Sequence, residues 1–390
     1  MRALFHGRVR TRFAGTCAVT FGHERSYSMS TKIPVGIIGA TGMVGQQYIR
    51  LLENHPWFQI EFLAASPQSA GKRYNLAAGG RWHADGDIPE SVGKLTVFDA
   101  ADVETASLRC RLVFSAVEME KSAIAALEEL YASKGMAVVS NNSAHRWTKD
   151  VPMIIPEINA DQLSCIQLQR TLRGWDRGCI VVKSNCSIQS YMTPLHALLR
   201  AGYRVDRMFV ATLQALSGAG YPGPSAFDLV DNIIPFINGE EEKSEKEPLK
   251  ILGCITGDGI ESAAVPRITA HCNRVPVLHG HTACVSMGFN AGKPEIAEIE
   301  TIWREFRGEP QLLNLPSAPR IPIIVRGESN RPQPRLDRDR EMAMAVTVGR
   351  LRSCPVLDIR FVGLHHNTIR GAAGGCVLTA ELLKVKGWLD

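Results

Sequence analysis

Short apolar runs alternate with amphipathic stretches through the first part of the chain, beginning at residue 33. The runs have the composition of buried strands, and the stretches between them carry apolar residues at the helical period. We interpret as strands the runs 35–38, 60–65, 112–116, 137–140 and 154–155, and as helices the stretches 44–53 and 122–134. This alternation of strands and helices predicts an α/β fold with a doubly wound parallel sheet of the Rossmann type.

Beyond residue 186 the pattern changes to longer strands with alternating polar positions. We expect a helix at 189–200, strands at 208–213, 283–289 and 343–351, a charged loop at 240–247, and a final helix at 374–383. Alternation along a strand is typical of a mixed or antiparallel sheet with one solvated face. The sequence therefore predicts a second domain of the α+β class.

The composition is that of a globular protein in water, with 45% hydrophobic and 21% charged residues. No apolar run approaches the ~18 residues of a membrane-spanning helix. The net charge of +5 comes from scattered basic residues, so we expect neither a membrane nor a nucleic-acid partner. At 390 residues the chain is too long for one ordinary core, which favours two domains.

The ten cysteines occur singly, without a Cys-x-x-Cys pair or a Cys/His cluster at zinc spacing. This usage predicts reduced thiols in a reducing compartment and no structural metal, and we expect a cytoplasmic protein.

The first 28 residues differ from the rest, with five arginines and only one acid, Glu24. An arginine-rich, acid-poor leader resembles an organelle transit peptide of the mitochondrial type. The alternative is an upstream start codon before Met29, whose segment is disordered or never made. We therefore leave residues 1–30 out of the predicted fold.

Three glycines at Gly-x-x-Gly-x-x-Gly spacing stand between the first predicted strand and the first predicted helix. Gly39 allows a tight turn, Gly42 lets backbone N–H groups approach a pyrophosphate, and Gly45 lets the helix pack against the strand. We predict a dinucleotide site, the alternative being a tight turn without a ligand. The cofactor-binding residues expected here are Gly39, Thr41, Gly42, Met43 and Val44.

The turn after the second predicted strand, at 65–72, contains no acid. An enzyme specific for NAD usually has an acid there to hold the ribose hydroxyls. Ser66, Ser69 and Lys72 suit a 2′-phosphate instead, so we predict NADP as the cofactor. The alternative is a solvated turn without a binding role.

One cysteine, Cys186, follows the apolar run 179–182 within Ser-Asn-Cys-Ser. A thiol at a strand end and close to a helix N-terminus has surroundings that lower its pKa and make it a nucleophile. Its attack on an aldehyde would form a thiohemiacetal, whose oxidation calls for a base and a hydrogen-bonding group near the carbonyl oxygen. His281 and Gln214 have those chemistries, although a lone cysteine or histidine is more often buried packing.

Three segments, in this order, resemble the aspartate-semialdehyde dehydrogenase family: Ser-Asn-Cys-Ser, Gln-Ala-Leu-Ser-Gly-Ala-Gly and Arg-Val-Pro-Val-Leu-His-Gly-His-Thr. The similarity runs from about residue 33 to the C-terminus. It implies that Cys186 is the nucleophile, that Gln214 orients the substrate at its carbonyl, and that His281 is the acid/base. His281 is selected over His279 because the family's base lies seven residues after an arginine, here Arg274.

The same resemblance implies which residues hold the substrate. Arg274 matches the arginine that binds the substrate carboxylate, for which a guanidinium is a suitable bidentate donor. Glu240 matches the acid facing the α-ammonium group, with Glu241 as the alternative register, and Lys243 and Arg146 match phosphate-binding residues. The alternatives are a solvated acidic segment and a surface arginine. Further cofactor contacts implied by the resemblance are Ser217, Gly218 and Asn367.

The resemblance implies an NADP-dependent enzyme that interconverts L-aspartyl 4-phosphate with L-aspartate 4-semialdehyde and phosphate through a cysteine thioester. That reaction lies on the route to lysine, threonine and methionine. Alternatives with related chemistry are a malonyl-CoA reductase and an N-acetyl-glutamyl-phosphate reductase, and one from another class is a catalytically silent nucleotide sensor. Because the family commonly has arginine where Gln68 stands, strict selectivity for NADP is in doubt.

The expected domains follow from the same resemblance. A dinucleotide-binding domain would span 31–183 and be completed by 366–390, and a catalytic and dimerisation domain would span 184–365. We expect a homodimer or homotetramer that takes a small-molecule substrate and phosphate.

Overall fold

The computed structural model describes residues 32–389. Our predictions for the leader at 1–30 lie outside the described residues. Within the described range, no helix combines the length and the apolar composition that a membrane crossing would need.

The first sheet has the strand order β3-β2-β1-β4-β5-β7-β6, and its strands pair in parallel. In chain order these strands are β1 (Ile33–Ile38), β2 (Phe58–Ala65), β3 (Val97–Asp99), β4 (Leu112–Ser115), β5 (Ala137–Ser140), β6 (Met153–Ile154) and β7 (Cys179–Lys183). Successive side chains enter two apolar cores, one on each face of the sheet. Burial on both faces explains why most residues of these strands are apolar.

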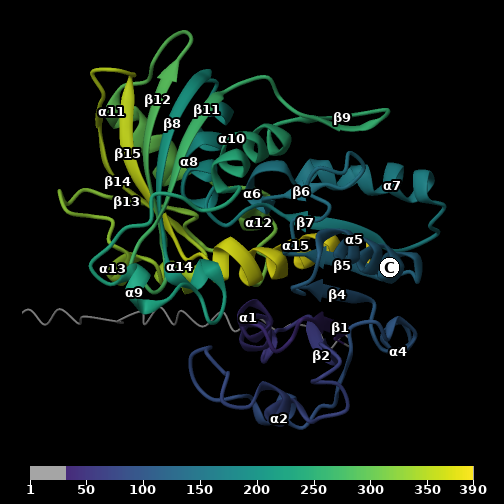
Figure 1. The fold of residues 1–390 in the computed structure, drawn as a ribbon. Coiled ribbons are helices and arrows are strands. Elements are labelled where there is room, and N and C mark those ends of the chain that lie inside the picture. The colour runs from purple at the N-terminus through teal and green to yellow at the C-terminus, as the bar shows by residue number, and fades with distance from the viewer. Residues whose placement is uncertain (1–31, 390) are drawn as a thin grey trace, which may run out of the picture. The chain divides into compact units, whose positions relative to one another are not determined.

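Helices cover both faces of this sheet. The core on one face includes α4 (Val103–Arg109) and α5 (Lys121–Ser133), and the core on the other includes α1 (Met43–Leu52) and α15 (Gly374–Val385). Figure 1 shows α15, in yellow, beside β5, which it contacts although it comes from the end of the chain. The predicted doubly wound, Rossmann-type sheet is confirmed.

The second sheet has the order β11-β8-β12-β15-β14-β13. Its strands are β8 (Val205–Gln214), β11 (Arg267–Arg274), β12 (His281–Phe289), β13 (Ile323–Arg326), β14 (Val346–Ser353) and β15 (Ile359–His365). β8 pairs in parallel with β11 and antiparallel with β12, so the sheet is mixed. Helices α8 (Gln189–Arg200) and α11 (Ile296–Glu305) pack against it, which confirms the α+β prediction for this part.

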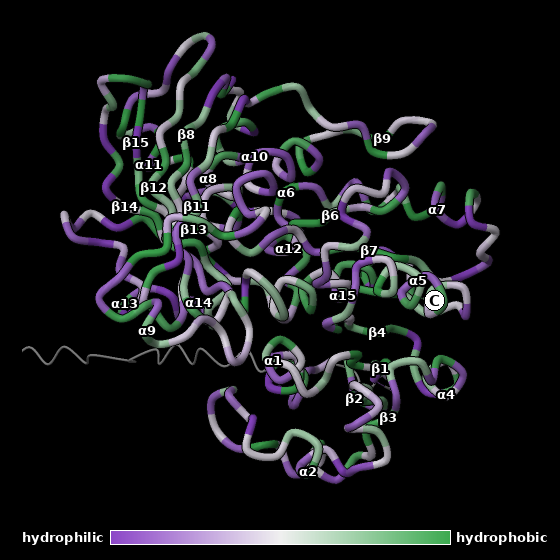
Figure 2. Tube along the Cα trace, in the orientation of Figure 1, coloured by the Kyte–Doolittle hydropathy of each residue, from purple (hydrophilic) through white to green (hydrophobic). Residues whose placement is uncertain are grey.

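The prediction of a charged loop at 240–247 is wrong, because this segment forms the first part of the helix α10 (Glu240–Ile251). Its buried residues recur every three to four positions, but most of them are polar, including Glu240, Ser244 and Glu247. A search for apolar periodicity therefore misses this helix, whose polar turns are purple in Figure 2. The strand predicted from 343 also begins later, at Val346.

The remaining elements are short or connect the two sheets. They are α2 (Tyr74–Ala78), α3 (Glu90–Gly93), α6 (Pro156–Asn159), η1 (Ala160–Ser164), α7 (Cys165–Arg173), η2 (Leu216–Ala219), α9 (Ala226–Leu229), β9 (Cys254–Thr256), β10 (Gly259–Glu261), α12 (Glu309–Leu312), α13 (Pro334–Asp337), α14 (Arg340–Ala343) and the π-helical turn η3 (Ile369–Ala373).

Candidate active site

Cys186 lies in the turn between β7 and α8, and buried side chains shape that turn. The Asn185 Oδ1 atom accepts hydrogen bonds from the Ser187 backbone N–H at 2.7 Å and from the Ser187 hydroxyl at 2.6 Å. The Asn185 backbone N–H donates to Glu247 Oε2 at 2.5 Å, and its Nδ2 donates to Glu240 Oε1 at 2.9 Å. Two carboxylates of α10 thus hold the residue next to the thiol.

His281 begins β12 and faces Cys186. Its Nε2 atom is 3.4 Å from the Cys186 Sγ atom, and the ring is fully buried. The other ring nitrogen, Nδ1, accepts a hydrogen bond from the Ala215 backbone N–H at 3.0 Å. The fold therefore brings together two residues that lie 95 positions apart in the sequence.

The electrostatics of this pair differ from the prediction for the thiol. Burial, assisted by the Glu240 carboxylate, raises the pKa of Cys186 to about 11, although three nearby cations oppose the rise. Burial also lowers the pKa of His281 to about 3, with Arg274 acting in the same direction. Burial therefore disfavours the charged form of both groups, and it shifts the thiol pKa in the direction opposite to the predicted lowering.

Gln214, Glu240 and Lys243 form one hydrogen-bonded group beside the thiol. Gln214 Nε2 donates to Glu240 Oε2 at 3.2 Å, and Lys243 Nζ donates to Glu240 Oε1 at 2.8 Å. Glu240 is buried at the first position of α10. Glu241 instead accepts from the Cys272 backbone N–H of β11 at 3.2 Å. Of the two acids whose register was left open, Glu240 is the one that joins this group.

Arg274 ends β11 beside Gln214, its partner in the neighbouring strand. It is buried, and its Nη1 atom donates to the Ala215 carbonyl oxygen at 2.7 Å. Gly218 faces the same place, because a Cβ atom there would lie 2.9 Å from His281 Cε1 and 3.0 Å from Arg274 Nη1. The absence of a side chain at Gly218 keeps the space in front of both residues open.

Arg146 is buried and not a surface arginine. Its Nη1 atom donates to Glu247 Oε1 at 2.9 Å, and its Nη2 atom donates to the Asn141 carbonyl at 3.1 Å. Glu247 also holds the Asn185 backbone, so Arg146 is linked to the thiol turn through this carboxylate.

The glycine-rich turn lies at the carboxyl end of β1, on the same edge of the sheet as the end of β7. Gly39 has φ +86°, and a Cβ atom there would lie 2.3 Å from the Ala116 carbonyl oxygen, so only glycine fits. Gly42 caps α1, whose first turn, including Met43 and Val44, contains no acid. No carboxylate of that turn would repel an anion bound at the helix N-terminus. This end of α1 is therefore suited to the pyrophosphate of a dinucleotide.

The other predicted cofactor residues fall into two groups. The Ser217 hydroxyl accepts from Asn367 Nδ2 at 2.9 Å, and Asn367 Oδ1 accepts from the Gly280 backbone N–H at 2.8 Å. These bonds join η2, the start of β12 and the C-terminal segment. After β2, Ser66 and Lys72 are exposed on the turn, whereas Ser69 is buried within it.

The sequence pattern did not identify every residue of the site. Lys183, only 2% exposed, ends β7, and its Nζ atom has no hydrogen-bond partner among residues 32–389. Burial lowers the pKa of Lys183 to about 8. A lysine ending an otherwise apolar run was the available signal for it. Glu247 and the Ala215 backbone gave no signal, because their contacts exist only in the folded chain.

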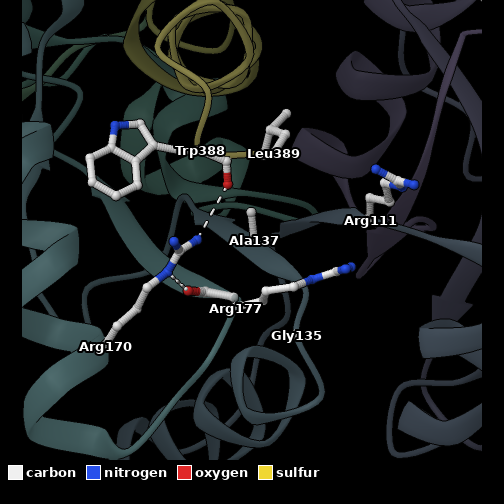
Figure 3. A pocket seen from close by; sticks show the side chains of 8 residues that line it. Arg111, Gly135, Ala137, Arg170, Arg177, Trp388 and Leu389 are labelled. Atoms are coloured by element: carbon white, nitrogen blue, oxygen red, sulfur yellow. Dashed lines mark hydrogen bonds between the residues drawn. The ribbon is translucent and has the colours of Figure 1, made fainter.

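A small cleft lies at the opposite, amino-terminal edge of the first sheet. Figure 3 shows Arg111, Arg170 and Arg177 around it, with Trp388 at its rim. Arg170 donates to the Gly178 carbonyl at 2.9 Å and to the Trp388 carbonyl at 3.4 Å. These bonds tie the end of the chain to the sheet, and the cleft shares no residue with the site around Cys186.

Two family models match the chain. The model described as "Semialdehyde dehydrogenase, NAD binding domain" matches residues 34–166, and the one described as "Semialdehyde dehydrogenase, dimerisation domain" matches residues 195–370. The aspartate-semialdehyde dehydrogenase of Schizosaccharomyces pombe is 43% identical over 357 residues, covering 90% of this chain and 98% of the relative. The enzyme of the same name from Methanothermobacter thermautotrophicus is 43% identical over 353 residues, covering 90% and 99%.

Solved structures agree with these matches. The aspartate-semialdehyde dehydrogenase of Candida albicans, solved with NADP, superposes with a TM-score of 0.84 at 38% identity, covering 91% of this chain and 99% of that one. An aspartate-semialdehyde dehydrogenase II from Vibrio cholerae superposes with a TM-score of 0.70 at 23% identity, which supports the fold alone.

Proposed function

The chain belongs to the aspartate-semialdehyde dehydrogenase family, and on that premise we propose that it interconverts L-aspartyl 4-phosphate with L-aspartate 4-semialdehyde and phosphate, using NADP. The observation that carries the proposal is the contact of 3.4 Å between Cys186 Sγ and the buried His281 Nε2, beside Glu240 and Arg274. A nucleophile, a proton-carrying group and groups of both charges are what this substrate requires.

The mechanism we propose runs through a thioester on Cys186. In the direction of aldehyde formation, the sulfur attacks the acyl carbon of the substrate and phosphate leaves. NADPH, when bound, supplies the hydride for the next step, in which the aldehyde forms. Gln214 would orient the carbonyl group, and His281 would act as the acid/base residue. Collapse of the tetrahedral species then re-forms the C=O bond, breaks the bond between the substrate carbon and the sulfur, and frees the Cys186 side chain.

The substrate's charged groups have candidate partners around the thiol. Arg274 would bind the α-carboxylate, and Glu240 would bind the α-ammonium group. The Lys243 Nζ atom lies 2.8 Å from the Glu240 Oε1 atom. We propose that Lys243 and Arg146 bind the phosphate. Because one N–H group of Arg146 is already bonded to Glu247, Arg146 would attract the phosphate partly through its charge and not only through hydrogen bonds.

The substrate assay separates this function from its rivals. We expect NADP reduction with aspartate semialdehyde and phosphate, and little or none with malonate semialdehyde and CoA. Glu240→Gln should raise KM for aspartate semialdehyde about 10- to 100-fold, because a hydrogen bond to a charged group contributes about 1.5–3 kcal/mol. Glu241→Gln is the matched control, since Glu241 bonds to β11 instead, and it should change KM much less. Efficient turnover of malonyl-CoA, with none of aspartyl phosphate, would remove the assignment.

Cofactor preference is a second expected result. The acid-free turn with Ser66 and Lys72 exposed should favour NADPH over NADH in kcat/KM. Gln68→Arg should widen that preference by about tenfold or more, because an arginine adds a charged hydrogen bond to the 2′-phosphate. Steady-state kinetics with both cofactors measures it, and a wild-type preference for NADH would mean that this turn is not a phosphate site.

We also propose that the chain forms a homodimer or homotetramer. The family model over 195–370 is described as a dimerisation domain. Support comes from the second sheet, where Phe209 and Cys284 are exposed on strands β8 and β12. A monomeric mass in light scattering would contradict this assembly.

A further inference from the structure

Lys183 is a buried lysine whose amine has no acceptor. Its side chain is 2% exposed, and its Nζ atom has no hydrogen-bond partner among residues 32–389. Another buried lysine, Lys250 of α10, has partners: its Nζ atom donates to three backbone carbonyl oxygens, at 2.7, 2.8 and 2.9 Å. A buried amine without an acceptor costs free energy whether it is charged or neutral. The stability of the fold therefore does not explain Lys183.

The C-terminal segment covers Lys183 and Cys186 together. A Cβ atom on Gly375 would lie 2.3 Å from Lys183 Cε, and one on Gly371 would lie 3.0 Å from Cys186 Cβ. The two glycines are four residues apart where η3 continues into α15, so they lie on the same side of this helical segment. Lys183 and Cys186 therefore lie along one helix face, which also shields the amine from water.

Other buried cations near the thiol have acidic partners. Arg146 pairs with Glu247 at 2.9 Å, and Arg370 pairs with Glu157 at 2.8 Å. Arg274 is proposed above for the α-carboxylate of the substrate, which would take up its charge. Lys183 bonds to no carboxylate among residues 32–389, so its charge is available to the sulfur of Cys186.

The charge of Lys183 is set by groups on the surrounding elements. Burial lowers the pKa of Lys183 to about 8, and Arg370 and Arg146 act in the same direction, whereas the thiols of Cys376 and Cys186 oppose the shift. His365 of β15 also interacts with Lys183, but burial holds the pKa of this imidazole well below its ordinary value. A pKa of about 8 for Lys183 keeps the ammonium form in place at neutral pH. A thiolate is the anion that such a group would stabilise.

We propose that Lys183 is a positioning residue for Cys186, because its ammonium group stabilises the thiolate that forms when the thiol gives its proton to His281 and again when the aldehyde leaves the sulfur. His281 keeps its acid/base role in both steps, and no proton or electron passes through Lys183. Of the two thiols near this amine, Cys186 is partly exposed in the site, whereas Cys376 is enclosed in α15. The role of the thiolate rests on the proposed function.

The reactivity of Cys186 toward iodoacetamide tests this charge without substrate, and so separately from the proposed function. Because the thiolate is the reacting form, alkylation at pH 7 should slow at least about tenfold in Lys183→Met, the effect of one pKa unit. Lys183→Gln, which is polar but uncharged, should slow it equally. Peptide mass spectrometry reports each cysteine, and the exposed Cys254 is the internal control. Cys186 rates within about threefold of the wild type in both variants would overturn the proposal.

The pH profile of alkylation separates an effect of charge from an effect of packing. Below about pH 8, where Lys183 titrates, the rate should rise about tenfold per pH unit with the thiolate fraction. Above that pH the amine also loses its proton, so a thiolate beside an ammonium group becomes an isomer of a thiol beside a neutral amine. The wild-type rate should then level off, and the rate of Lys183→Met should keep rising. Parallel profiles would contradict the role given to the charge.

Stability gives a further readout. Lys183→Met should raise the urea midpoint of unfolding, because an apolar side chain replaces a buried amine without a partner. Lys250→Met is the matched control and should lower the midpoint, because three carbonyl oxygens lose their donor. A lower midpoint for Lys183→Met would show instead that the amine supports the fold, and the proposal would then be rejected.

Discussion

Cys186→Ala is expected to lower turnover by at least about 10⁴-fold, the scale seen when a covalent nucleophile is removed. NADPH affinity should stay near the wild-type value, because the thiol lies after β7 whereas the glycine-rich turn lies after β1. Turnover is measured as NADP reduction, and affinity by titration of NADPH fluorescence.

Two other cysteines provide controls for this experiment. Cys272→Ala removes a buried thiol whose Sγ atom is 3.6 Å from the Ser244 hydroxyl, and Cys284→Ala removes an exposed one. Both variants should keep most of the activity. Substantial turnover by Cys186→Ala would reject the nucleophile assignment and direct the search to these residues.

Arg370→Met is expected to lower the free energy of unfolding by about 3–5 kcal/mol, because it leaves a buried carboxylate unpaired. Arg370 donates to Glu157 Oε1 at 2.8 Å and Oε2 at 3.2 Å, and both side chains are at least 98% buried. Arg370 lies in η3, where a Cβ on Gly371 would come 3.0 Å from Cys186 Cβ. Loss of the pair should therefore also loosen the backbone against the thiol.

Urea unfolding followed by circular dichroism measures this effect. Arg304→Met is the matched control, because its pair with Glu300 is about half exposed and should contribute no more than about 1 kcal/mol. Replacing both Arg370 and Glu157 by methionine should recover much of the loss, since no unpaired charge remains. A change below about 1 kcal/mol for Arg370→Met alone would contradict the role given to this pair.

Much of the fold could be predicted from local pattern. Strands such as β5 (Ala137–Ser140) and β7 are apolar up to their last residue because both faces of a parallel sheet are buried, and that signal is visible in any single sequence. Gly39 was predicted for a tight turn, and its positive φ has a local steric reason. The helix α10 was missed because its buried face is polar, so its period appears only when its partners are known.

For the site, the sequence by itself determined which residue types stand in which order, and the three motif segments were enough to predict Cys186, Gln214 and His281 as a group. Their roles stay predictions. Only the tertiary structure decided the partners of the His281 ring, since the Ala215 N–H reaches Nδ1 from another strand. It also decided the pKa of Cys186, which burial raises. Proton positions and pKa values depend on desolvation and on groups brought close by folding, and neither quantity is encoded in the spacing of residues along the chain.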